Sequence, residues 1–105
     1  MIHYHVWFSL KPGIDEHEGL SAVQAFLNDL LQADDIGAFH LLRNSGTLPK
    51  TRLLPFHALI EFRNEAQFGV AFAAQAKNGI HNGAHGRVLA VVAEFQIEVF
   101  KEISF

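Results

Sequence analysis

The first stretch of the chain, Ile2–Lys11, alternates between two kinds of side chain. Every second position is apolar: Ile2, Tyr4, Val6, Phe8 and Leu10. The positions between them hold a mostly polar set: His3, His5, Trp7, Ser9 and Lys11. A period of two, rich in β-branched and aromatic residues, predicts a β-strand whose two faces differ in chemistry. The following Pro12-Gly13 predicts a turn that ends this strand.

The remaining periodic segments predict two helices and three more strands. Apolar residues at helical spacing predict a helix over Glu16–Ala33, capped by Asp15, and a second helix over Glu65–Lys77. Alternation predicts strands over Ala38–Asn44, Phe56–Arg63 and Glu94–Glu102. The order β-α-β-β-α-β is the ferredoxin-like pattern of an α+β fold, and the length suits a single domain over residues 1–105.

Two segments between these elements are rich in glycine or proline. Ser45–Pro55 contains Gly46, Pro49 and Pro55, and is predicted to be a long connecting loop. Asn78–Gly86 contains three glycines, so we expect the second helix to be interrupted there. A helical turn is predicted to resume over Arg87–Val92.

The ferredoxin-like pattern predicts an antiparallel sheet in the strand order 4-1-3-2, with both helices on one face. The apolar faces of the first, third and fourth strands would then form one core beneath the helices. From the fourth strand, that core is expected to take Phe95, Ile97 and Val99.

The opposite face of the predicted sheet, called the open face from here on, has no third layer to cover it. It carries His3, His5, Trp7, His57, Leu59, Glu61, Gln96, Glu98 and Phe100. Hydrophobic residues make up 50% of the chain and ten residues are phenylalanine, which is more apolar material than so small a monomer easily hides. We therefore expect a homodimer in which two open faces pack together around a polar and aromatic cavity.

Composition argues against several classes of function. The net charge is −3 and the eight basic residues are scattered, so binding to nucleic acid or to an acidic membrane is not expected. The chain has no cysteine, which excludes disulfides, thiolate catalysis and cysteine-type zinc sites. No apolar stretch long enough for a membrane span and no signal-peptide pattern is visible, so we predict a cytoplasmic protein.

Histidines supply the most reactive side chains of the open face. His3 and His5 are two positions apart on one strand, so both point to the same side. Imidazole titrates near neutral pH and can transfer protons. If Glu61 lies near His5, the pair would form a general base with an orienting carboxylate. The alternative, that these residues only line a polar dimer cavity, stays open at this point.

Metal binding is a weaker interpretation, because three or four ligands must converge on the ion. The only set on the open face that could supply them is His3, His5, His57 and Glu61. His81 and His85 are four apart, but they lie among glycines that weaken a helix. We therefore predict no metal and no cofactor, and we expect His85 either to cap the helical turn or to lie at the mouth of the ligand cavity.

The opening strand and turn carry a resemblance to a known group of proteins. They read His3-Tyr4-His5-Val6-Trp7-Phe8-Ser9-Leu10-Lys11-Pro12-Gly13, which resembles the dimeric α+β-barrel proteins and in particular the stress-responsive A/B-barrel domains. His81 and His85 fit loosely the histidines that these proteins commonly carry before the last helical stretch. The superfamily includes cofactor-independent monooxygenases, isomerases, haem-binding peroxidases, a polyketide cyclase and proteins without known activity. The resemblance thus implies the fold and a homodimer, but not one function.

Three functional hypotheses follow. The first is a small-ligand-binding or stress-associated homodimer without catalysis. The second is a cofactor-independent monooxygenase or isomerase for a small aromatic or hydrophobic substrate, with His5 as base, Glu61 as its orienting partner and Trp7 as a platform for the substrate. The third and weakest is haem or metal binding through a cavity histidine.

Overall fold

A computed structural model describes residues 1–46, 53–78 and 83–105, leaving aside the side chains of residues 75–78, 83 and 84. Its elements are β1 (Ile2–Leu10), α1 (Glu16–Gln32), β2 (Ala38–Arg43), β3 (Phe56–Phe62), α2 (Glu65–Asn78), α3 (Gly83–Val91) and β4 (Val92–Lys101). The predicted order of strands and helices is confirmed. The middle of the predicted loop over Ser45–Pro55, and His81, lie outside the described residues.

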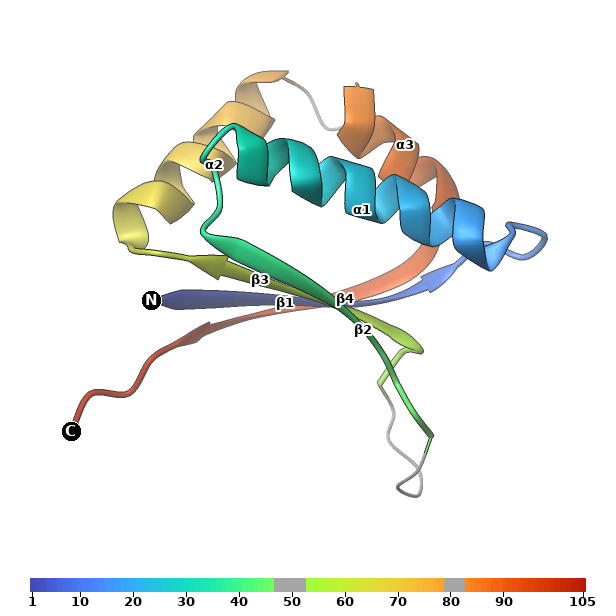
Figure 1. Ribbon diagram of the computed structural model, residues 1–105, viewed down its shortest axis with the longest axis horizontal. Coiled ribbons are helices and arrows are strands. Elements are labelled where there is room, and N and C mark those ends of the chain that lie inside the picture. The colour runs from blue at the N-terminus through green and yellow to red at the C-terminus, as the bar shows by residue number, and fades with distance from the viewer. Residues whose placement is uncertain (47–52, 79–82) are drawn as a thin grey trace.

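The four strands form one antiparallel sheet in the order β2-β3-β1-β4, which confirms the predicted 4-1-3-2 order. The helices all lie on the same side of this sheet (Figure 1). β1 is central, and its register with β3 sets Trp7 opposite His57, and His3 opposite Glu61. Within the described residues the other side of the sheet carries no helix, as expected for the open face.

The core lies between the sheet and the helices. Asp15 starts α1 by accepting a hydrogen bond from the backbone N–H of Glu18 at 3.1 Å, the usual N-cap arrangement. One turn after another, α1 then buries Val23 and Leu27 against the sheet. The buried apolar residues of this cluster are Ile2, Phe8, Val23, Leu27, Ile36, Phe56, Ala58, Ile60, Phe62 and Ala71.

The interruption predicted after α2 ends earlier than expected. The glycine-rich sequence favours non-helical backbone until Arg87, but α3 already begins at Gly83. Packing against α1 accounts for the difference, since the His85 ring lies 5.1 Å from the Phe26 ring, centroid to centroid. Tertiary contact of this kind outweighs the roughly 1 kcal/mol by which each glycine disfavours a helix.

The expected burial of β4 beneath the helices is wrong. Phe95, Ile97 and Val99 are 58%, 40% and 47% exposed, although they lie on the helix side of the sheet. α3 leads directly into β4, so the helix layer ends over the first residues of this strand. Val92 still packs against the core, and the residues that follow extend beyond that cover.

None of the helices in the described ranges combines the length and the apolarity needed to cross a membrane.

Replacement of Leu27 tests the position of the core. Leu27 is 2% exposed, so Leu27→Ala should lower the free energy of unfolding by about 2–5 kcal/mol through lost burial and a residual cavity. Val70 on α2 is 64% exposed, and Val70→Ala should change stability by no more than about 0.5 kcal/mol. Urea unfolding followed by circular dichroism measures both. Equal effects of the two substitutions would contradict the described core.

Candidate functional site

The centre of the open face brings two histidines into direct contact. His5 of β1 and His57 of β3 lie diagonally across the strand pair, a separation that ring side chains can span. His57 Nε2 and His5 Nδ1 are 2.8 Å apart, which is a hydrogen bond. One of these two nitrogens therefore carries a proton and donates the hydrogen bond to the other.

Aromatic rings frame this histidine pair. Trp7 stacks on His57, with centroids 4.7 Å apart and an interplanar angle of 14°. On the other side, the Phe100 ring meets His5 edge-on at 4.8 Å. Trp7 is partly buried, whereas Phe100 is 47% exposed. The pair thus sits in a frame that is apolar on both sides and open towards solvent.

The surroundings favour the neutral state of both imidazoles. Partial burial, and secondarily the positive charge of His3, lower the pKa of His5. Partial burial, and secondarily the charge of His5, lower the pKa of His57. The neutral form of each ring is therefore favoured, and a pair of neutral imidazoles that share one hydrogen bond retains one outer N–H donor and one outer basic nitrogen. This arrangement can bind a hydroxyl group or accept a proton.

The expected pairing of His5 with Glu61 is wrong. The register sets His5 opposite Leu59, and Glu61 opposite His3. Glu61 Oε1 is 3.9 Å from His3 Nδ1, and the partner that orients His5 is instead His57. In this register His57 and Glu61 are both diagonal neighbours of His5, and the side-chain contacts distinguish them, since His5 hydrogen-bonds to His57 whereas Glu61 lies beside His3.

His3 has a stronger partner that the sequence analysis did not single out. Glu102 Oε1 lies 2.6 Å from His3 Nε2, and the Glu102 backbone N–H donates to the Met1 carbonyl at 3.3 Å. The alternation of β4 already contained a signal for this contact, because Glu102 continues the open-face positions Glu98 and Phe100.

The remaining predicted site residues divide between the two sides of the sheet. Gln96 lies opposite Trp7 and Glu98 opposite His5, so both belong to the open face. His85 does not, since it lies in α3 with its ring against Phe26 of α1. No group of three or more His, Asp or Glu side chains placed to hold a metal ion occurs in the described part of the chain.

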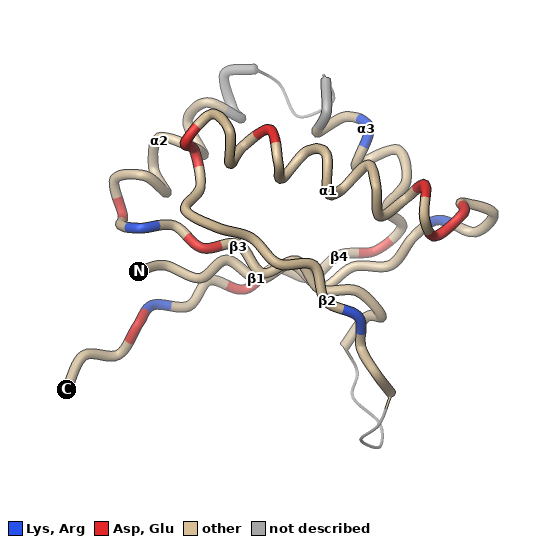
Figure 2. Tube along the Cα trace, in the orientation of Figure 1, with Lys and Arg blue, Asp and Glu red and all other residues tan. Residues whose placement is uncertain are grey.

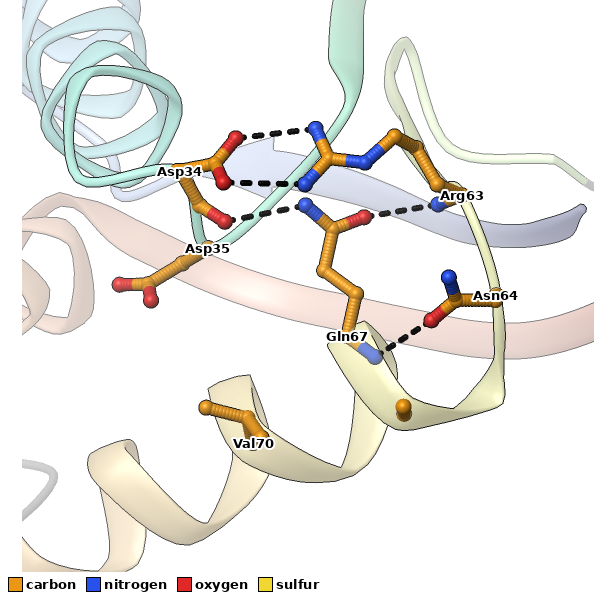
Figure 3. A pocket seen from close by; sticks show the side chains of 7 residues that line it. Asp34, Asp35, Arg63, Asn64, Gln67 and Val70 are labelled. Atoms are coloured by element: carbon orange, nitrogen blue, oxygen red, sulfur yellow. Dashed lines mark hydrogen bonds and ion pairs between the residues drawn. The ribbon is translucent and has the colours of Figure 1, made fainter.

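Two hollows lie away from the open face. One, of about 280 Å³, lies where the α1–β2 and β3–α2 connections meet (Figure 3). There the Arg63 guanidinium binds both carboxylate oxygens of Asp34, at 2.9 and 3.0 Å, and Gln67 donates to the Asp34 carbonyl at 3.0 Å. The other, of about 530 Å³, contains an ion pair between Arg43 and Glu16. The guanidinium of each hollow already has a carboxylate partner, so neither arrangement points to an anionic ligand.

Comparison with known families gives one match that covers almost the whole chain. Residues 1–104 match the model of a family described as a family of unknown function, DUF6614. No curated protein matches the sequence.

Solved structures show the fold. A protein from Arabidopsis thaliana is 13% identical, with a TM-score of 0.75 over 100% of this chain and 98% of that one. A protein from a Jannaschia species, described as dimeric, ferredoxin-like and of unknown function, is 18% identical, with a TM-score of 0.69 over 96% and 98%. A protein described as an antibiotic biosynthesis monooxygenase is 12% identical, with a TM-score of 0.65 over 99% and 100%. Other matching structures are described as a DABB-family protein and as further dimeric ferredoxin-like proteins of unknown function.

The lowered pKa values of His5 and His57 predict a loss of stability in mild acid. The unfolded chain takes up protons at its histidines as the pH falls through about 6.5, whereas the folded pair resists protonation. The free energy of unfolding should therefore fall as the pH falls below about 6.5, until the folded pair is itself protonated. Thermal unfolding between pH 8 and pH 5, followed by circular dichroism, measures this dependence.

A double variant isolates the contribution of the pair. His5→Phe with His57→Phe keeps flat rings but removes the titrating nitrogens, so its stability should fall less between pH 6.5 and pH 5. His17→Gln, at an exposed position of α1, should keep the wild-type dependence. An unchanged pH dependence in the double variant would contradict the assignment.

Proposed function

The chain belongs to DUF6614, a family of unknown function, and we propose that it is a small-ligand-binding homodimer whose two open faces pack together around the His5–His57 pair. The ligand class that this site fits is a small, flat aromatic or hydrophobic molecule with one polar group. The Trp7 and Phe100 rings would pack against its apolar part. The outer nitrogens of the histidine pair would bind its polar group.

The observation that carries this proposal is the neutral histidine pair in its aromatic frame. The two imidazoles lie 2.8 Å apart on the face of the sheet away from the described helices, and they offer both a hydrogen-bond donor and an acceptor. Aromatic rings flank both of them. Binding sites typically combine an apolar lining with a few converging polar groups. The open face has this composition, whereas each hollow elsewhere is dominated by an internal ion pair.

The dimer is proposed because the open face leaves large apolar side chains exposed to water. Phe100 and Leu42, on opposite strands of this face, are each 47% exposed. A second open face packed about 10 Å away would bury both, along with Trp7 and Leu59. Neighbours with the same fold are described as dimeric, which supports this arrangement. Because the open face also carries histidines, the interface would not be wholly apolar, and this favours a cavity between the two copies that is lined by polar and aromatic side chains.

Proton-transfer catalysis is a second candidate function. The lowered pKa of His5 makes it a free base near neutral pH, with His57 as the orienting group in place of Glu61. This chemistry suits a cofactor-independent isomerase or monooxygenase, and a protein described as a monooxygenase shares the fold. We do not propose metal binding, because the described residues contain no group of three His, Asp or Glu side chains that could hold a metal ion. Haem binding, a role in stress and a cytoplasmic location stay predictions.

Ligand binding can be followed through Trp7, the only tryptophan of the chain. The probe is 4-nitrophenol, which is flat, carries one hydroxyl group and quenches tryptophan fluorescence. We expect saturable quenching in the wild type. The variants His5→Phe and His57→Phe keep the rings but lose a hydrogen bond worth about 1 kcal/mol, so affinity should fall about five- to tenfold.

The control is His17→Gln, which removes an exposed histidine from the helix layer and should bind the probe as the wild type does. Linear, non-saturating quenching in the wild type, or equal affinity in His57→Phe, would contradict the proposed site. The catalytic alternative predicts in addition a turnover rate that falls as the pH falls through the titration of the pair.

A further inference from the structure

The two faces of the sheet differ in the charge of the side chains that the strands place on them. The acidic residues of the four strands all occupy open-face positions: Glu61, Glu94 and Glu98. The basic residues of the strands occupy the helix side, where Arg43 pairs with Glu16 of α1 and Lys101 pairs with Glu65 of α2. Figure 2 shows these charged positions along the trace. Within the described strands, the open face therefore has carboxylates but neither lysine nor arginine.

Glu98 is the carboxylate that lies directly opposite His5 across the β1–β4 pair. Side chains at directly opposed positions have Cβ atoms about 5 Å apart. Glu98 is exposed, and it forms no hydrogen bond or ion pair with any of the described residues. Glu102, in contrast, is bound by His3 at 2.6 Å. The carboxylate of Glu98 is thus an uncompensated negative charge beside the histidine pair.

The aromatic frame around the pair adds a second attraction for a positive charge. Phe100 follows Glu98 as the next open-face position of β4, and its exposed fraction of 47% leaves ring surface available to a ligand. Cations are attracted to the faces of Trp and Phe rings. The histidines between these groups do not oppose a cation, because burial lowers the pKa of both His5 and His57 and so favours their neutral forms.

We propose that Glu98 selects ligands that carry a basic amine, so that the molecule bound on the open face is a small aromatic amine. This inference rests on the proposed function and adds the charge of its ligand. β3 and β4 lie on either side of β1. A flat ligand that lies across β1 would place its hydroxyl group at the histidine pair and its ammonium group at Glu98. A carboxylate or phosphate ligand would meet the repulsion of Glu98 instead.

The preference should be moderate in size. An exposed ion pair strengthens binding by up to about fivefold, and a cation over an exposed aromatic ring by about two- to fivefold. Removal of water from the ammonium group offsets part of this gain. We therefore expect a preference of about three- to tenfold for a cationic ligand over a neutral one of the same shape.

Three phenols that share the ring and the hydroxyl group test the charge of the ligand. Near neutral pH tyramine is cationic, 4-propylphenol is neutral and 4-hydroxyphenylacetate is anionic. Each titration is followed by NMR through the indole N–H signal of Trp7, the only tryptophan of the chain. Tyramine should bind about three- to tenfold more tightly than 4-propylphenol, and 4-hydroxyphenylacetate should bind more weakly than either.

A matched pair of variants tests the role of Glu98. Glu98→Gln keeps the shape of the side chain and removes its charge, so the ratio of tyramine affinity to 4-propylphenol affinity should fall about two- to fivefold. The control is Glu94→Gln, which makes the same change on the same face opposite Ser9. It lies about 13 Å along β4 from Glu98, beyond the screening length of about 8 Å at physiological salt, and should keep the wild-type ratio. Circular dichroism confirms the fold of each variant.

The remaining outcomes separate this inference from the proposed function. Equal affinity for the three phenols, or tightest binding of the anion, would overturn the selection by charge and leave the binding site standing. A ratio that Glu98→Gln leaves unchanged, or that both variants lower equally, would overturn the assignment to Glu98. Absence of saturable binding by all three phenols would overturn the proposed site and this inference together.

Discussion

β1 is hydrogen-bonded on both sides, to β3 and to β4, and therefore runs through the middle of the sheet. Its alternation commits one face to the core beneath the helices, where Ile2 and Phe8 are buried. The same alternation commits the other face, with His3, His5 and Trp7, to a side that has no helix. A two-layer α+β fold has no means of its own to cover that side. The histidine cluster and the proposed dimer both follow from this constraint.

The hydrogen bond between His5 and His57 gives the open face its chemistry. Two imidazoles in contact favour the neutral state, because a proton on one raises the cost of a proton on the other. Trp7 stacks on His57 and Phe100 meets His5 edge-on, so an aromatic ring flanks each member of the pair. A site of this kind suits a ligand with a hydroxyl group, and it suits proton transfer if the ligand can ionise. Binding is thus the more general of the two proposed functions, and catalysis would be built on it.

The sequence was sufficient for the fold but only partly for the site. Period-two and helical patterns predicted the strands and most of the open face, and the ferredoxin-like pattern predicted the order of the sheet. They could not predict that His5 meets His57 instead of Glu61, because both are diagonal neighbours of His5 across the strand pair and the choice depends on side-chain conformation. They also could not predict the exposure of Phe95 and Val99, since alternation tells which face a residue lies on and not how far the helix layer extends. The early start of α3 is a third case, in which packing of His85 on Phe26 outweighs local propensity.

The central claim is that a second copy of the chain covers the open face. Sedimentation equilibrium of the wild-type protein at micromolar concentration tests it most directly, because the mass obtained does not depend on shape. The account predicts twice the chain mass of 11.7 kDa, with dissociation only on strong dilution. A single species of 11.7 kDa across the micromolar range would contradict it.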